Sequence, residues 1–103
     1  MFVVMNRFPV NPDYAGQFET RIANRPRQVE QQPGFIRAQL LRPTRPDTPY
    51  IVLTVWQTQA DFEAWVNAPD FTASHAGPRT LAAEAFNGSN QVETFEVILD
   101  SEQ

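Results

Sequence analysis

The fold is decided by the stretch FIRAQLLRPTRPDTPYIVLTVW (35–56). Its two ends, residues 35–41 and 50–56, are short runs of mostly apolar, β-branched and aromatic residues, which is typical of strands. The segment between them, residues 42–49, contains three prolines and is typical of a turn region. We therefore expect the stretch to form a hairpin with a loop of moderate length.

Two further strands are expected near the ends of the chain. Residues 2–9 are rich in valine and phenylalanine and end at Pro9. Residues 92–99 form a last run with the composition of a strand. The hairpin therefore lies between an early strand and a late one.

A helix is expected between the first strand and the hairpin. Asn11 is a favourable N-cap residue, and Pro12 is favourable at the first helical position. Apolar residues at helical spacing then continue to about Gln32. Pro26 lies inside this stripe and should kink or divide the helix near Arg25.

A second helix is expected after the hairpin. Thr58 is a favourable N-cap residue, and Asp61 occupies the capping-box position. The apolar face of this helix consists of Phe62, Trp65 and Val66. Residues 70–79 give no clear pattern, whereas residues 80–86 are expected to be helical.

The resulting order is βαββαβ, the ferredoxin-like α+β arrangement with helices on one face of an antiparallel sheet. The open face of such a sheet is polar in a monomer. Here the strand at 50–56 has apolar residues on both faces: Ile51, Leu53 and Val55 on one, Tyr50, Val52 and Trp56 on the other. Because a second apolar face must be covered, we expect two copies to pack sheet to sheet as a two-fold homodimer.

The composition narrows the function classes. We expect residues 1–103 to form a single domain. The formal net charge of -4 argues against a nucleic-acid partner, which needs a basic surface. The absence of cysteine excludes disulfides, thiolate metal sites and a cysteine nucleophile. Without a signal peptide or a stretch long enough for a membrane helix, we expect a cytoplasmic protein with no membrane partner.

Two polar residues, Asn6 and His75, are candidates for chemistry. Asn6 shares a strand face with apolar residues, so its amide is either satisfied by a neighbouring backbone group or aimed into a cavity as a donor. His75 is the only histidine and is either a surface residue or a metal ligand. His75 cannot build a zinc site alone, because such a site needs several protein ligands and the chain has no thiolate, whereas haem iron needs only one protein ligand. Haem is therefore the metal cofactor that this composition best permits.

Three further candidates also have a purely structural explanation. Trp65 lies on the apolar stripe of its helix, where core packing accounts for it. Arg21 and Arg25 lie one helical turn apart, so that both can reach one anionic group or both can face solvent.

Several segments together resemble a known family. They are the early strand with Asn6, residues 31–43, residues 50–65, and FTASHAGPR (71–79). This combination looks like the antibiotic-biosynthesis monooxygenase superfamily and, within it, is similar to the IsdG/MhuD-type haem-degrading monooxygenases. The resemblance covers residues 2–100. It implies a homodimer in which two ferredoxin-like sheets form a dimeric α+β barrel, with one active site per subunit.

The resemblance also implies roles for single residues. His75 matches the axial ligand to the haem iron, and Asn6 matches the distal residue that hydrogen-bonds the ligand bound by the iron. Trp65 matches the aromatic residue that presses on the porphyrin and distorts it. Arg25 and Arg21 match, less closely, the positive charge that the family offers to the haem propionates.

The implied function is haem degradation, with haem as both cofactor and substrate, O2 as oxidant and iron released on ring opening. Electrons must come from an outside reductase or small-molecule reductant, because the sequence contains no flavin or nicotinamide motif. Two alternatives remain open. A cofactor-independent oxygenase of polycyclic phenols or quinols would position its substrate with Asn6 and Trp65. A non-catalytic haem-binding protein would hold haem through His75 without chemistry.

Overall fold

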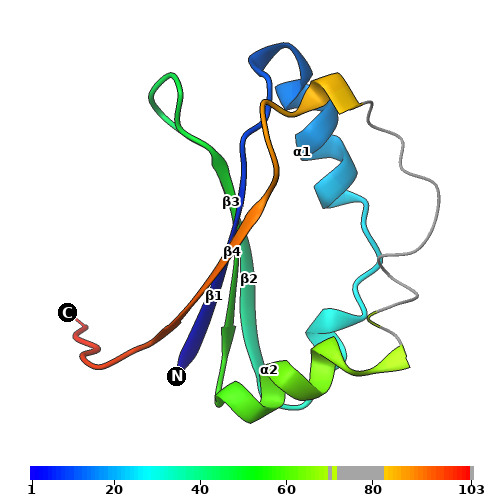
Figure 1. The fold of residues 1–103 in the computed structure, drawn as a ribbon. Helices are drawn as coiled ribbons and strands as arrows, with labels where there is room; N and C mark the ends of the chain where they lie inside the picture. The colour runs from blue at the N-terminus through cyan, green and yellow to red at the C-terminus, as the bar shows by residue number, and fades with distance from the viewer. Residues whose placement is uncertain (70, 72–82, 103) are drawn as a thin grey trace.

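The computed structural model describes residues 1–69, 71 and 83–102, and its centre is a four-stranded antiparallel sheet. The strands lie in the order β2-β3-β1-β4. Their bounds are β1 Phe2–Phe8, β2 Phe35–Leu41, β3 Tyr50–Trp56 and β4 Gln91–Glu96. Two α-helices, α1 (Ala15–Ala23) and α2 (Gln59–Val66), lie on one side of the sheet (Figure 1). This arrangement confirms the predicted ferredoxin-like α+β fold.

The hairpin strands have the bounds expected from the sequence, but the first helical region is shorter than the stripe of apolar residues. Asn11 caps a 3₁₀ turn, η1 (Pro12–Tyr14), which leads into α1. The helix ends at Ala23, and a second 3₁₀ turn, η2, covers only Val29–Gln31. The chain is therefore divided around Pro26, as expected from the loss of its backbone N–H.

The last strand is shorter than predicted. β4 ends at Glu96 rather than at residue 99, and Glu96 is the register partner of Phe2, the first residue of β1. Beyond that pair the Val97 N–H donates to the Met1 carbonyl, and Ile98 is then 93% exposed. A helix was also predicted at residues 80–86, of which the structure describes 83–86. These residues contain a 3₁₀ turn, η3 (Ala83–Ala85), instead of an α-helix.

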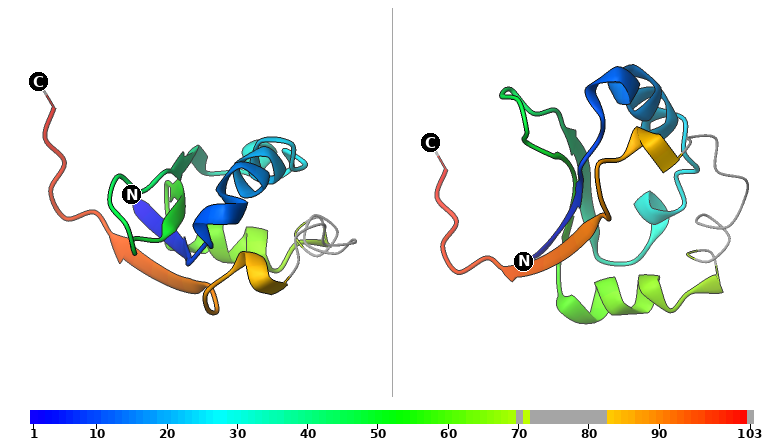
Figure 2. Two further views of the ribbon diagram at one scale, coloured as in Figure 1. Left: turned by 90° about the horizontal axis from the view of Figure 1, so that it is seen from above. Right: turned by 45° about the horizontal axis from the view of Figure 1, so that its top comes forward.

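Two aromatic clusters pack at opposite ends of the helix-covered face. Near the start of β1, the α2-side cluster consists of Phe2, Phe35, Trp56, Phe62, Trp65 and Phe71. Near the end of β1, the α1-side cluster consists of Phe8, Phe18, Tyr50 and Phe86. Figure 2 shows that α1 and α2 likewise lie toward opposite ends of the sheet. The middle of this face is therefore flanked by two packed blocks.

The other face of the sheet carries no described helix and is mixed in character. Apolar residues of β1 and β3 on this face lie beside Arg37 and Gln39 of β2 and beside the ion pair of Arg7 with Glu93. Register pairs place Val3 beside Val55 and Met5 beside Leu53 on this face, and Phe95 of β4 is 45% exposed there. In Figure 1 the helices lie on the opposite side of the strands. Among the described residues, no helix is both long and apolar enough to cross a membrane.

Gly34 joins η2 to the hairpin in a conformation that a side chain would disturb. Its φ is +81°, and a Cβ there would overlap the side chain of Asp61 in the α2 capping box. We expect Gly34→Ala to destabilise the protein by about 2 kcal/mol or more, because it adds left-handed strain to a steric clash. The check is chemical denaturation.

Gly16→Ala is the matched control for this prediction. Gly16 lies in α1 with nothing within 4 Å of the position of its Cβ. Alanine there should stabilise the protein by roughly 0.4–1 kcal/mol. Equal stabilities of the two variants would contradict the account of Gly34.

Candidate functional site

An open hollow lies on the helix-covered face where α1 ends against the hairpin strands. Its volume is about 50 Å³, and its lining residues are Ile22, Arg25, Ala38, Gln39, Leu40 and Val52. This volume is well below the roughly 300–1,000 Å³ of pockets that enclose a whole ligand. The hollow therefore suits one substituent of a larger molecule rather than the whole of it.

Asn6 lies in the same cross-strand row as two of the residues that line the hollow. It is the register partner of Val52 in β3, and Val52 is in turn the partner of Leu40 in β2. All three are only half-buried, whereas Phe2 and Tyr50 near the ends of the same face are buried. The middle row is therefore less buried than Phe2 and Tyr50, as are Phe8, Ala38 and Thr54 on the same face.

The amide of Asn6 is oriented by a side chain rather than by the backbone. Asn90 donates from Nδ2 to Asn6 Oδ1 at 2.9 Å. Because that contact takes the carbonyl oxygen, the Nδ2 group of Asn6 remains as the donor end of the amide. The amide oxygen of Asn6 is therefore satisfied by a side chain, and the role of its Nδ2 group as a donor into a cavity stays a prediction.

Trp65 is a core residue of the α2-side cluster. It is 5% exposed, belongs to the buried group that includes Val4, and meets Phe71 edge to face with 5.4 Å between ring centroids. Val4 precedes Asn6 by two residues on the same strand face, so that Trp65 and Asn6 share one side of the sheet. The packing explanation of Trp65 therefore holds.

The two candidate arginines are not placed as neighbours on one helix. Arg21 lies in α1, whereas Arg25 lies beyond the Asn24 cap, so the expected one-turn spacing is wrong for this pair. Arg25 lines the hollow and donates from Nη1 to the Ile22 carbonyl at 3.0 Å. The Nη2 atom of Arg25 is 4.0 Å from Glu30 Oε1. Because a guanidinium has five N–H donors, these two contacts do not use all of them.

His75, the predicted axial ligand, lies outside the described residues, as do the neighbouring residues 72–82. In the part of the chain that the structure describes, no group of three or more His, Cys, Asp or Glu side chains could hold a bare metal ion. Of the candidate residues from the sequence, Asn6, Trp65, Arg21 and Arg25 lie in the described part of the chain, and their roles stay predictions.

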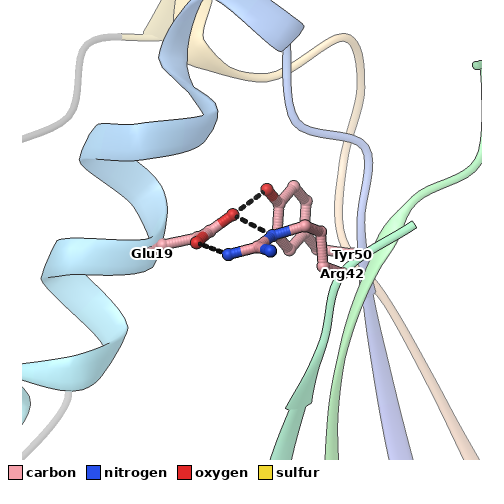
Figure 3. Close-up of polar contacts among 3 residues, drawn as sticks. All are labelled: Glu19, Arg42 and Tyr50. Carbon is pink, nitrogen blue, oxygen red and sulfur yellow. Dashed lines mark hydrogen bonds and ion pairs between the residues drawn. The ribbon is translucent and has the colours of Figure 1, made fainter. Parts of the chain in front are cut away.

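A polar network that was not predicted from the sequence joins α1 to β3 and to Arg42, the residue after β2 (Figure 3). Glu19 accepts two hydrogen bonds from the Arg42 guanidinium, at 2.8 and 2.5 Å, and a third from the Tyr50 hydroxyl. The bond to Arg42, reinforced by the one to Tyr50, lowers the pKa of Glu19 from 4.5 to about 2. Burial and the bond to Glu19 raise the pKa of Tyr50. These residues are 23 and 31 positions apart, so no local pattern reveals the network.

This network makes stability depend on pH in acid. Since folding lowers the pKa of Glu19 to about 2, its contribution is fully present above about pH 4.5 and is lost as the pH falls toward 2. We expect Glu19→Gln to lower the melting temperature only slightly at pH 6, because the pair with Arg42 is largely exposed. The difference from the unsubstituted protein should shrink at pH 3. A difference of equal size at both pH values would contradict this assignment.

Comparison with protein families gives the class of protein that this fold and site define. Residues 1–77 match the model of the family "antibiotic biosynthesis monooxygenase". The chain belongs to this family, which confirms the predicted resemblance.

The relatives specify the branch. The chain is 40% identical over 98 residues to a "heme oxygenase (mycobilin-producing)" of Mycobacterium tuberculosis H37Rv, covering 95% of this chain and 90% of that protein. It is 30% identical to a "heme oxygenase (staphylobilin-producing)" of Staphylococcus haemolyticus, covering 82% and 83%. A solved structure of the heme-degrader MhuD from M. tuberculosis, with two hemes bound in its active site, superposes with a TM-score of 0.81. That match has 37% identity and covers 99% of this chain and all of MhuD.

Proposed function

We propose that this protein is a haem-degrading monooxygenase that opens the porphyrin ring with O2 and electrons from an outside donor. The observation that carries the proposal is the combination of fold and likeness: haem oxygenases of two genera match 82–95% of the chain at 30–40% identity. Two features of the described residues also support the proposal. They are the half-buried amide of Asn6 and the hollow that Arg25 lines.

The described residues fit the chemical character of haem. Arg25 stands beside the apolar Ile22, Leu40 and Val52, a lining that suits a carboxylate on a short apolar stem such as a propionate. Val52 and Leu40 in the middle row offer an apolar surface that suits a flat ring. Arg21 lies four residues before Arg25 and adds positive charge at the same end of α1.

Each residue has a defined task in this proposal. His75 supplies the single protein ligand that haem iron needs, since the chain has one histidine and no cysteine. Asn6 donates from Nδ2 to oxygen as it gains negative charge, and Asn90 keeps that donor pointed. Trp65 has the role of distorting the porphyrin, through the small exposed part of an indole that Phe71 and the core hold rigid. Bound haem supplies the iron that activates O2 and the ring that is opened.

Titration of the purified protein with haemin is the first test. We expect a saturable shift of the Soret band, followed by loss of that band when ascorbate and O2 are added. A bound haem that survives reductant and oxygen would leave a non-catalytic haem carrier. No shift beyond that of free haemin, together with oxygen uptake on a polycyclic quinol, would replace the proposal with the cofactor-independent oxygenase.

We also propose that the working form is a homodimer built on the open sheet face. All described helices lie on the other side, and the uncovered face presents Val3, Met5, Leu53 and Phe95. A second copy covers such a face by two-fold self-association. The external reductase or reductant and the cytoplasmic location expected from the sequence remain parts of the proposal.

The dimer leads to a direct prediction. Leu53→Arg introduces a charge into the centre of the open face, and we expect light scattering to show conversion to a monomer at micromolar concentration. Gln17→Arg adds the same charge on an exposed position of α1, on the other side of the sheet, and should leave the dimer intact. An unsubstituted protein that is monomeric at this concentration would overturn the proposal.

A further inference from the structure

The network of Glu19, Arg42 and Tyr50 lies directly beside the hollow and connects its two walls. On the helix wall, Glu19 is one turn before Ile22. On the sheet wall, Arg42 follows Leu40 by two residues and Tyr50 precedes Val52 by two. Figure 3 shows the Glu19 side chain reaching from α1 to both strands.

Both apolar packing and hydrogen bonds attach α1 to the sheet. Phe18 is the buried residue of α1 and packs against Tyr50 with 5.1 Å between ring centroids. Apolar packing is non-directional, so this contact alone permits the helix to shift along the sheet. The neighbouring Glu19 takes a two-pronged bond from Arg42, which fixes orientation as well as distance.

Because the network is exposed, we expect it to affect the position of α1 more than the stability of the protein. The Arg42 side chain is 72% exposed, and ion pairs in such surroundings contribute little to the free energy of unfolding. Its main consequence is geometric: it sets where the end of α1, and therefore Arg25, stands relative to Leu40 and Val52.

We infer that Glu19, Arg42 and Tyr50 are positioning residues of the haem site, which hold the α1 wall in register with the hairpin so that the anionic edge of the porphyrin is seated in one orientation. The inference rests on the proposed function. A fixed edge determines which bridging carbon of the ring faces the activated oxygen. The network therefore controls the selectivity of ring opening as well as affinity.

Three variants test this inference. Tyr50→Phe removes one hydroxyl and keeps the ring against Phe18. Arg42→Lys keeps the charge but loses the two-pronged geometry, and Glu19→Gln removes the acceptor charge. Glu63→Gln is the matched control, because it removes one carboxylate on the exposed surface of α2. Each protein is measured for haemin Kd, for melting temperature and for the proportions of ring-opened isomers by chromatography.

We expect Arg42→Lys and Glu19→Gln to raise the haemin Kd about tenfold, and Tyr50→Phe to raise it less. In all three the share of minor isomers should at least double, roughly, since a misplaced edge admits other orientations of the ring. Glu63→Gln should match the unsubstituted protein.

Unchanged isomer proportions overturn the inference, whether or not the melting temperature falls, because simple loosening of the fold lowers the amount of active protein without changing selectivity. This failure is distinct from failure of the proposed function. In the latter case the unsubstituted protein itself would not bind haemin or open the ring.

Discussion

Replacing His75 with alanine is expected to reduce haem turnover by at least about 100-fold. The reason lies in the composition: the chain has one histidine and no cysteine, so no second imidazole and no thiolate can take over the iron. The measurement is the decay of the Soret band of bound haem under ascorbate and O2. The haemin titration should show a weaker shift with a different band position.

Chemical rescue separates ligation from folding in this variant. Free imidazole should restore part of the Soret shift and of the turnover if the missing group is the ligand. The melting temperature of the haem-free variant should remain close to that of the unsubstituted protein. A variant that consumes haem at the original rate would show that His75 is not the ligand and would return it to the class of surface histidines.

Local signals were sufficient for most of the sheet. The strands at 35–41 and 50–56 have the expected bounds because prolines and polar turn residues mark the inner end of each run. The break near Pro26 was predictable for the same reason, since a proline acts on its own backbone. The N-cap at Thr58 is likewise confirmed by the hydrogen bond that its side chain accepts from the Asp61 N–H.

Features that depend on distant partners were not predictable. The composition of residues 92–99 favours a strand throughout, yet β4 ends at Glu96, the register partner of Phe2. Beyond that pair the Val97 N–H still donates to the Met1 carbonyl, whereas Ile98 and Leu99 are exposed. The contact between Asn6 and Asn90 joins positions 84 apart, so the sequence left open whether that amide was directed. The burial of Trp65, in contrast, was predictable from the apolar stripe of its own helix. The structure adds the side of the sheet on which Trp65 lies.

Asn6 leads to the second large effect. We expect Asn6→Ala to lower the rate of haem turnover about 100-fold, which is typical for loss of one directed donor to a developing negative charge. The haemin Kd should change by less than about threefold, because Asn6 does not ligate the iron in this scheme. Stopped-flow measurement of single turnovers checks the rate separately from binding.

Two companion variants identify which end of the amide matters. Asn6→Asp keeps the oxygen that accepts from Asn90 but has no N–H to donate, so it should lose as much rate as alanine. Asn90→Ala keeps the donor but releases its orientation, and it should lose less, about five- to tenfold. If Asn6→Asp kept full activity while Asn90→Ala lost it, the contact between the two side chains would be structural and the donor role of Asn6 would be wrong.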